Sequence, residues 1–517
     1  MTRLDTHHQD STNTQIVLAT LNARYIHAAF GLRYLKANLG ELQENCVIEE
    51  FTLESRAEDI VESLLIHQPK IIGFGIYIWN VEQTTRVIGL LKAVDPLVKV
   101  VIGGPEVSYE LDQQVVVSLA DYVITGWGEK SFANLCSSLL QGEEISQKVI
   151  SGIQPKLTDI KMPYALYNEQ DIKNRVLYVE ASRGCPFKCE FCLSALDKTA
   201  WPFDLDLFLA EMDRLYKRGA RHFKFVDRTF NLKVNNSLRI LEFFLERLDD
   251  DLFLHFEVIP DHLPEALKKM IARFPAGSMQ FEIGIQTFNA QVQQQISRKQ
   301  NNEKSQQNIR WIKEHSKVHV HADLIFGLPG ETLNSFEDSF NQLIDLNPDE
   351  IQVGILKRLK GSPIIRHTQT HQLVFNPNPP FAIVSSDTVT YAQVQTINRF
   401  ARYWDLIGNS GRFSSTLNLL IQDNPFKCFS IIADQLFART GQTHKISLLR
   451  LYDLVFDIAV EHLAINKEQI LQCIKNDFEQ SGLKSIPKCL QELTGKSKNI
   501  NQISKGAHRR RQVRHQR

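Results

Sequence analysis

Three of the chain's eight cysteines, Cys185, Cys189 and Cys192, lie within one stretch of eight residues. In a tight loop, this CxxxCxxC spacing brings three thiolates to one side, where they can hold one small inorganic cluster. Iron–sulfur clusters normally take four cysteine ligands, and the next cysteine along the chain is Cys428. The spacing therefore favours an iron–sulfur cluster in which one iron has no protein ligand, and an iron with open positions can bind a chelating substrate.

Two other interpretations of the three cysteines remain open. A histidine such as His222 could join them in a tetrahedral zinc site. Structural zinc sites usually pair two CxxC-like halves, and the sequence has no second half. Free thiols that serve only packing are a third interpretation, but three cysteines in one short loop rarely arise by chance.

The composition limits the class of protein. The chain has 517 residues, 43% hydrophobic and 23% charged, and its 59 basic residues equal its 59 acidic residues. These values are typical of a soluble globular protein and exclude a disordered, collagen-like or coiled-coil chain. No apolar run approaches the roughly 20 residues that span a bilayer, and the first residues do not resemble a secretory signal. We therefore expect a cytoplasmic protein of about three domains with no membrane contact.

Residues 15–145 alternate short apolar runs with segments of helical period. Near-continuous hydrophobic strands separated by helices are typical of a parallel sheet covered on both faces. The region therefore predicts an α/β, doubly wound, Rossmann-like domain. The expected strands are 15–20, 46–51, 70–76, 98–103 and 122–125.

A second βα series follows a connector at 146–175 that is marked by glycine and proline. It covers residues 176–365 and contains six βα units. Six such units are compatible with a partial barrel and with an open sheet, and periodicity does not choose between them. The expected strands begin near residues 176, 222, 253, 280, 318 and 350.

The remaining segments show no βα alternation. Residues 366–493 contain amphipathic segments that predict a mainly helical domain. Residues 1–14 are polar and expected to be flexible, and residues 494–517 lack apolar periodicity and end in a basic run at 508–511. We expect this last stretch to be a disordered, solvated tail that makes at most a weak contact with nucleic acid.

The sequence SRGCPFKCEFC at 182–192, with Phe191 directly before the last cysteine, resembles the signature of the radical S-adenosylmethionine superfamily. The loop follows the first strand of the second series, which is where that superfamily places it in a (β/α)6 partial barrel. The resemblance implies a four-iron four-sulfur cluster that reductively cleaves S-adenosylmethionine to a 5′-deoxyadenosyl radical. It also implies an electron donor such as flavodoxin or ferredoxin. The cofactor carries the difficult chemistry and the protein supplies position.

The resemblance further implies contacts with S-adenosylmethionine on later strands. The chain has no GGE segment after the second strand, so Asp227 is the expected acceptor for the cofactor's ammonium group. Arg298 stands where relatives often meet the cofactor's carboxylate. The other expected contacts are Phe191, Glu282, Gln286, Asp323 and Gly327. Each could instead be a salt bridge, a surface charge or a turn, but their order after the cysteine loop favours a cofactor site.

A doubly wound domain before such a barrel resembles the cobalamin-binding domain of a large subfamily. The segments IGGPE at 102–106 and GWGE at 126–129 carry this resemblance, because glycine lets backbone approach a flat ligand. The lower-ligand motif DxHxxG is absent, and His27 does not have its spacing, so we do not expect His27 to ligate cobalt in the usual way. The expected cobalamin-binding residues are Asn22, Tyr25, His27, Trp79, Gly103, Gly104, Gly126 and Glu129.

The leading hypothesis is a cobalamin-dependent radical S-adenosylmethionine methyltransferase that acts on a poorly activated carbon. One alternative is a cobalamin-independent radical enzyme, a cyclase or a rearrangement enzyme, with a degenerate N-terminal domain. Another is a non-catalytic iron–sulfur sensor or RNA-associated protein that uses its basic tail. The substrate and the role of the helical C-terminal domain are not predicted by the sequence.

Overall fold

The structure is a computed structural model that describes residues 14–197 and 199–491. The expected flexible start at 1–14 lies almost wholly outside these residues, and the expected basic tail lies outside them entirely. The chain divides into two compact units, and each is described by itself. The first contains residues 1–228, 358–363 and 376–381; the second contains residues 229–357, 364–375 and 382–517.

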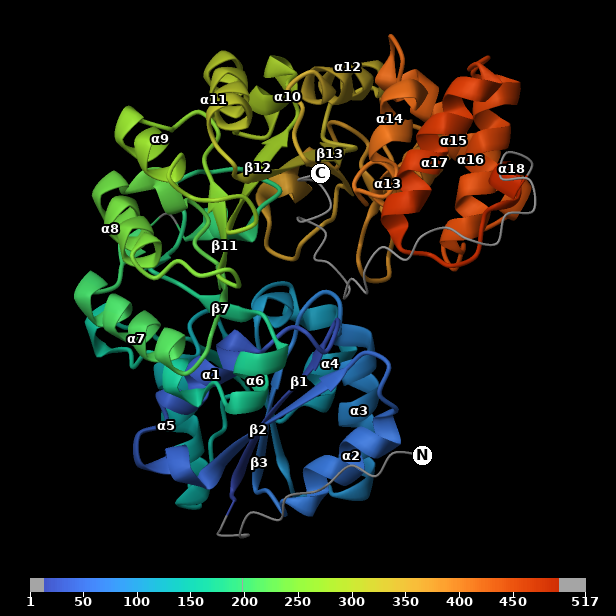
Figure 1. The fold of residues 1–517 in the computed structure, drawn as a ribbon. Coiled ribbons are helices and arrows are strands. Elements are labelled where there is room, and N and C mark those ends of the chain that lie inside the picture. The colour runs from blue at the N-terminus through green and yellow to red at the C-terminus, as the bar shows by residue number, and fades with distance from the viewer. Residues whose placement is uncertain (1–13, 198, 492–517) are drawn as a thin grey trace. The chain divides into compact units, whose positions relative to one another are not determined.

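The first unit begins with a parallel sheet in the order β2-β1-β3-β4-β5-β6 (Figure 1). Alternate residues of β1 enter two different cores: Val17 and Ala19 pack with residues of α2 and α3, and Ile16 and Leu18 with residues of α1 and α5. Both faces of the sheet are therefore covered by helices, which confirms the doubly wound fold. The strands are β1 (Ile16–Asn22), β2 (Cys46–Thr52), β3 (Ile71–Gly75), β4 (Lys99–Gly103), β5 (Tyr122–Thr125) and β6 (Val149–Ser151). The helices are α1 (Phe30–Ala37), α2 (Ala57–Ile66), α3 (Val81–Val94), α4 (Val115–Leu119) and α5 (Glu129–Leu140).

The sheet has one strand more than the sequence predicts. β6 lies within the segment expected to be a connector and pairs in parallel with β5. It has only three residues, so it lacks the run of apolar residues by which a buried strand is recognised. Strand order reverses between β1 and β3, and the carboxyl edge of the sheet at such a reversal, called the crevice below, is the usual ligand position in such sheets.

The first unit continues into the start of the second βα series. β7 (Leu177–Val179) pairs in parallel with β10 (His222–Phe225), and helix α7 (Leu205–Lys217) precedes β10. A short antiparallel pair, β8 (Ser182–Arg183) with β9 (Trp201–Pro202), stands on either side of the cysteine loop. The connector contributes helix α6 (Glu169–Asn174), which begins with a capping box at Asn168.

The second unit contains four parallel strands in the order β14-β13-β12-β11, with helices between them. Along β13, Val320, Ala322, Leu324 and Phe326 are fully buried and alternate with polar residues on the opposite face. The strands are β11 (Phe253–Val258), β12 (Met279–Gln286), β13 (His319–Phe326) and β14 (Glu350–Ile355). The helices are α8 (Val234–Leu245), α9 (Glu265–Ile271), α10 (Ala290–Gln295), α11 (Asn302–His315) and α12 (Leu333–Ile344).

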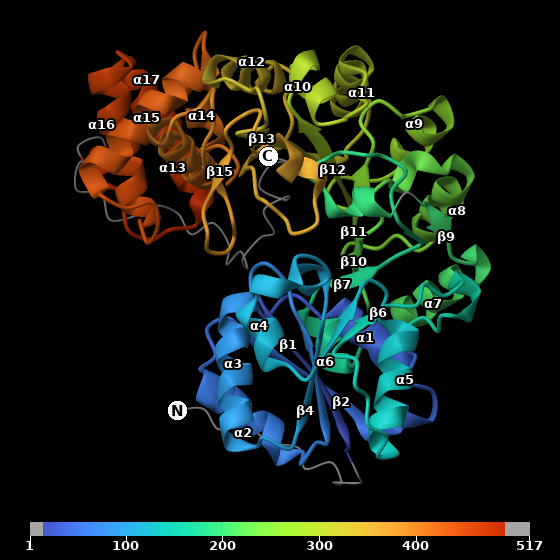
Figure 2. The ribbon, with the colours of Figure 1, turned by 180° about the vertical axis from the view of Figure 1, so that it is seen from behind.

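The carboxy-terminal part of the second unit is mainly helical, as the sequence predicts (Figure 2). The Phe340 ring of α12 lies 4.9 to 5.9 Å from the rings of Trp404, Phe400 and Phe426, so an aromatic core joins these helices to the strand-bearing part. A two-stranded hairpin, β15 (Val374–Phe375) with β16 (Ile383–Ser385), was not expected. The helices are α13 (Tyr391–Ile407), α14 (Ser414–Leu420), α15 (Pro425–Thr440), α16 (Leu448–His462), α17 (Lys467–Ser481) and α18 (Lys488–Gln491). Among the described residues, no helix is long and apolar enough to span a membrane.

Candidate functional site

The cysteine loop is closed by hydrogen bonds of its own backbone. The Cys185 N–H donates to the Asp197 carbonyl at 3.1 Å, and the Cys192 N–H donates to the Cys189 carbonyl at 3.1 Å. Gly184 has φ +90°, and a Cβ there would collide with the carbonyl oxygen of Thr199. Only glycine fits at this position, so the approach to Cys185 depends on it.

The three thiols suit a cluster that carries positive charge. All three lie outside disulfides and are partly exposed, and the neighbouring Phe191 is also partly exposed. Burial raises the pKa of the Cys185 thiol, and the nearby Cys192 and Cys189 raise it further. The thiols are thus close enough to repel one another as thiolates, a repulsion that bound iron would remove. Within 14–197 and 199–491, no group of three or more Cys, His, Asp or Glu side chains is already arranged to hold a metal ion.

Asp227, which follows β10, fastens the strand that leads into this loop. One carboxylate oxygen accepts from the Ala181 N–H at 3.0 Å and the other from the Ser182 hydroxyl at 2.6 Å. Burial raises the pKa of Asp227 to about 7 despite these two hydrogen bonds. Its contact with the ammonium group of S-adenosylmethionine stays a prediction, because both oxygens here accept from the chain itself.

Arg183 is a central residue that the sequence analysis did not single out. Its guanidinium group binds Glu180 at 2.8 Å and Glu129 at 2.5 Å. Glu129, expected to contact cobalamin, is therefore a buried partner of an arginine beside the cysteine loop. The position of Arg183 just before Gly184 and Cys185 was the available signal, but nothing in the sequence pairs it with a residue 54 positions earlier.

Three glycines lie at the crevice, at the carboxyl ends of β4 and β5. Gly104 has φ +116°, and a Cβ there would lie 2.5 Å from the Ile76 carbonyl oxygen, so backbone packs against backbone. A Cβ on Gly103 would lie 3.3 Å from the Ile124 carbonyl oxygen. Gly126 has φ +69° and faces open space, with no described atom within 4 Å of its Cβ position. The crevice can therefore receive a flat ligand close to the backbone at Gly126.

Aromatic side chains are exposed at the same edge of this sheet. Tyr25, after β1, is 54% exposed and Trp79, after β3, is 48% exposed. The Trp79 ring stacks on Tyr77 with centroids 4.5 Å apart and planes 8° apart. Large apolar surfaces left in water at a crevice mark a ligand position, and they fit the face of a corrin ring.

His27 is held by the chain. Its Nδ1 lies 2.7 Å from the Tyr178 hydroxyl, and its carbonyl accepts from the Asn22 side chain at 2.9 Å. Burial, followed by the charges of Lys224 and Arg24, lowers the pKa of His27. Asn22 and His27 thus organise the loop after β1, and cobalamin contact by either stays a prediction.

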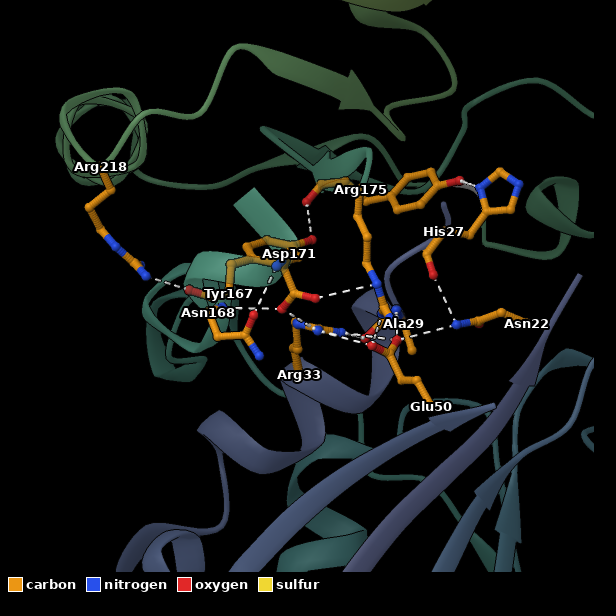
Figure 3. A network of polar contacts seen from close by, with 11 residues as sticks. Asn22, His27, Ala29, Arg33, Glu50, Tyr167, Asn168, Asp171, Arg175 and Arg218 are labelled. Atoms are coloured by element: carbon orange, nitrogen blue, oxygen red, sulfur yellow. Dashed lines mark hydrogen bonds and ion pairs between the residues drawn. The ribbon is translucent and has the colours of Figure 1, made fainter. Parts of the chain in front are cut away.

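A buried network of four charges lies next to these residues (Figure 3). Arg33 binds Glu50 at 3.1 Å and Asp171 at 2.7 Å, and Arg175 binds the same two carboxylates. Burial alone would raise the pKa of Glu50, but Arg33 and Arg175 hold it below its usual value. The network joins α1 and β2 of the first sheet to α6 of the connector.

In the second unit, polar residues occupy one face of neighbouring strands. His255 on β11 binds Glu282 on β12 at 2.8 Å, and His321 binds Asp323 at 3.2 Å and Glu350 at 3.2 Å. Burial alone would lower the pKa of His321, but hydrogen bonds to its two carboxylate neighbours raise it to about 10. His321 was missed by the sequence analysis and places a positive charge between Asp323 and Glu350.

The end of β12 carries an unusual backbone. Gln286 has φ +68° beside a register shift at Gly284, and its buried Oε1 accepts no hydrogen bond from any described residue. Strained residues and unsatisfied acceptors are both more common at ligand sites. Arg298 donates to the Gly284 carbonyl and to Gln300. Gly327 has φ +88°, and the space for its Cβ is filled by Ile383, so packing also requires glycine there.

Three family descriptions match the chain. Residues 16–136 match the B12 binding domain and residues 179–343 match the Radical SAM superfamily. Residues 369–516 match a family described as a protein of unknown function, DUF4080. The first two matches cover the sheet with the exposed crevice and the segment that contains the cysteine loop.

Similar proteins have related descriptions. An uncharacterised methyltransferase of Pyrococcus horikoshii is 25% identical over 383 residues, which cover 67% of this chain and 80% of that protein. The cobalamin-dependent radical SAM methyltransferase TokK of Streptomyces tokunonensis is 24% identical over 380 residues, 60% of this chain and 49% of TokK. The anaerobic magnesium-protoporphyrin IX monomethyl ester cyclase of Rubrivivax gelatinosus is 22% identical, and the alignment covers 61% of each chain.

A solved structure has a similar fold. The radical S-adenosylmethionine methyltransferase TsrM of Kitasatospora setae, solved with tryptophan and an S-adenosylmethionine analogue, aligns with a TM-score of 0.58 at 16% identity. The alignment covers 71% of this chain and 80% of TsrM.

Proposed function

The chain belongs to the radical S-adenosylmethionine superfamily and carries a cobalamin-binding domain, and from this premise we propose that it methylates a poorly activated carbon atom. It is a radical SAM enzyme, and its cofactors are a four-iron four-sulfur cluster, S-adenosylmethionine and cobalamin. The observation that carries the proposal is that one unit contains both a closed three-cysteine loop and a sheet crevice with exposed aromatic rings.

Different residues of the first unit would hold the cluster and the cobalamin. Cys185, Cys189 and Cys192 would hold the cluster, and Trp79 and Tyr25 would cover the cobalamin and exclude water from it. When bound, these groups supply reductive cleavage of S-adenosylmethionine and a carrier for the methyl group. Asp227 keeps the strand before the cysteine loop in place through its bonds to Ala181 and Ser182.

In the second unit, the residues offer complementary groups for a polar cofactor. The Gln286 Oε1 can accept a hydrogen bond, and the Arg298 guanidinium can bind a carboxylate. Glu282 and Asp323, expected contacts of the same cofactor, are oriented by His255 and His321. These roles rest on the residue chemistry and on the superfamily to which the chain belongs.

The test is anaerobic reconstitution of the purified protein with iron and sulfide, followed by S-adenosylmethionine and dithionite. We expect 5′-deoxyadenosine to form, and its formation to disappear in Cys185→Ala. If the cluster is intact and no 5′-deoxyadenosine forms, the result contradicts the radical chemistry. We propose a flavodoxin or ferredoxin as the physiological electron donor in a cytoplasmic setting.

A cobalamin-independent cyclisation is the second candidate, because one similar protein is named a cyclase. Addition of hydroxocobalamin distinguishes the two. Methyl transfer predicts that the corrin spectrum stays with the protein through gel filtration and is reduced in Trp79→Ala. A wild-type protein that retains no corrin would favour cyclisation.

A further inference from the structure

Arg183 lies between the two regions that would hold the metal cofactors. It is a β8 residue and stands two positions before Cys185. Its Nη1 lies 2.5 Å from Glu129 Oε1, and its Nε lies 2.8 Å from Glu180 Oε1. Glu129 is the first residue of α5 and ends the GWGE segment after β5, whereas Glu180 belongs to the same strand region as Arg183. The bond to Glu129 is therefore the one that crosses from one region to the other.

The arginine has little freedom to leave this position. Its side chain is 14% exposed, and the two carboxylates are 8% and 9% exposed. Aromatic rings enclose the guanidinium, with ring centroids at 4.4 Å for Tyr34, 4.9 Å for Trp127 and 5.5 Å for Phe203. A planar guanidinium that is desolvated, stacked and doubly bonded has one favourable orientation.

A displacement of Arg183 would also move the backbone of the cysteine loop. Arg183 pairs with Trp201 across the β8–β9 ladder, and the next residue is Gly184, which packs against the Thr199 carbonyl. The Cys185 N–H is fixed to Asp197. On the other side, Glu129 begins α5 three residues after Gly126, the glycine that faces open space. The pair therefore ties the backbone beside the first cysteine to the backbone beside the crevice.

We propose that Arg183, through Glu129, is a positioning residue that couples the cysteine loop to the cobalamin crevice, so that occupation of one stabilises the other. The proposal rests on the proposed function for the identity of the crevice ligand. The coupling itself concerns bonds within the chain and can be measured without either cofactor.

Hydrogen–deuterium exchange of the cofactor-free protein is the first test. Glu129→Gln keeps the shape of the side chain and removes its charge, and Arg183→Lys keeps the charge and loses the two-pronged geometry. We expect amide exchange across residues 183–192 to rise by about tenfold in Glu129→Gln and by less in Arg183→Lys, because Arg183 would keep its bond to Glu180 but lose the charged partner on α5. Unchanged exchange in that loop for both variants would overturn the proposal.

Arg33→Lys is the matched control, because Arg33 is also buried and binds two carboxylates. Its guanidinium also lies over an aromatic ring, 4.9 Å from the centroid of Tyr167. Within the described residues, its hydrogen bonds and ion pairs join it to Ala29, Glu50 and Asp171, which all lie outside the cysteine loop. We expect it to speed exchange in α1 and α6 but not at 183–192. If Arg33→Lys loosens the cysteine loop as much as Glu129→Gln does, the effect is general destabilisation and the proposal fails.

The second test adds hydroxocobalamin as the probe. In the wild type it should slow exchange at residues 183–192, and in Arg183→Lys it should bind within a few-fold of the wild-type affinity but slow that exchange less. Equal protection in both proteins would overturn the coupling. A wild type that binds no hydroxocobalamin would instead contradict the proposed function, and the cofactor-free exchange would still decide the role of Arg183.

Discussion

The first unit contains two buried charge clusters that differ in their balance. Arg33, Arg175, Glu50 and Asp171 bring two positive and two negative charges together, so each carboxylate has an arginine (Figure 3). Beside the cysteine loop, one arginine, Arg183, serves two carboxylates. The pKa values follow this difference: arginines hold that of Glu50 low, whereas burial raises that of Glu180. In the balanced cluster the charges cancel, which suits a purely structural role. The cluster around Arg183 has one more carboxylate than arginine and lies next to a predicted cofactor site.

The largest expected effect is the loss of an arginine from the balanced cluster. Arg33→Met should lower the free energy of unfolding by about 3–5 kcal/mol, because Glu50 and Asp171 would stay buried with less compensation. Urea denaturation followed by circular dichroism measures the change. Arg86→Met, which breaks the exposed pair with Glu82 on α3, is the control and should cost less than about 1 kcal/mol. Similar losses in the two variants would contradict the role of burial.

The same substitution should act differently in the two clusters. Glu50→Gln should destabilise the protein by about 2–4 kcal/mol, because two arginines lose their shared carboxylate. Glu180→Gln should change stability by less than about 1 kcal/mol, because it removes surplus charge and leaves Glu129 to bind Arg183. Both values come from urea titrations at one pH. If Glu180→Gln is as costly as Glu50→Gln, the clusters do not differ in balance.

The pH dependence of stability should have opposite signs in the two regions. Glu50 has a lowered pKa, so its stabilisation is present above its unfolded pKa and is lost as the pH falls through the folded value. Asp227, beside the cysteine loop, has its pKa raised from 3.8 to about 7, so stability should fall as the pH rises between these values.

Between pH 5 and pH 7, the free energy of unfolding should therefore fall by about 2 kcal/mol less in Asp227→Asn than in the wild type. Unfolding curves at several pH values test this, with Glu50→Gln as the variant that flattens only the acid side. A wild-type profile that Asp227→Asn leaves unaltered would show that Asp227 does not titrate in this range.

A further expected effect concerns the cysteine loop rather than the charges beside it. Gly184→Ala should cost about 1–2 kcal/mol, because the alanine must adopt a positive φ. It should also lower reconstituted iron content by about half, because its Cβ meets the Thr199 carbonyl. Gly142→Ala has a similar φ of +82° and no atom within 4 Å of the Cβ position, so it is the matched control. Equal iron content in the two variants would remove the collision as an explanation.

Much of the fold could be predicted from the sequence, because apolar runs and helical period are local properties. The doubly wound sheet and the helical carboxy-terminal region were expected on that basis, and the comparisons support both. β6 and the β15–β16 hairpin were not, because two or three residues give too short a pattern. The domain boundaries stay predictions.

The candidate site shows the same division. Cysteine spacing points to the cluster loop, since ligands for one cluster lie close in sequence. The bonds of Arg183 to Glu129 and of Asp227 to Ser182 could not be predicted, because an ion pair or hydrogen bond between residues 45 or more positions apart leaves no periodic signal. Asn80 is a further example: it is fully buried and its side chain donates to Thr20 and Leu21 of β1 and to Gly75 of β3, contacts that no sequence pattern indicates.

The ladder between β8 and β9 affects how the cysteine loop acquires metal. Together with the bond from Cys185 to Asp197, it closes the loop before any iron is present. Loop-closure entropy is therefore lost when the protein folds and not when the cluster assembles. Incoming iron would need only to reorient three side chains, so more of its binding free energy stays available as affinity.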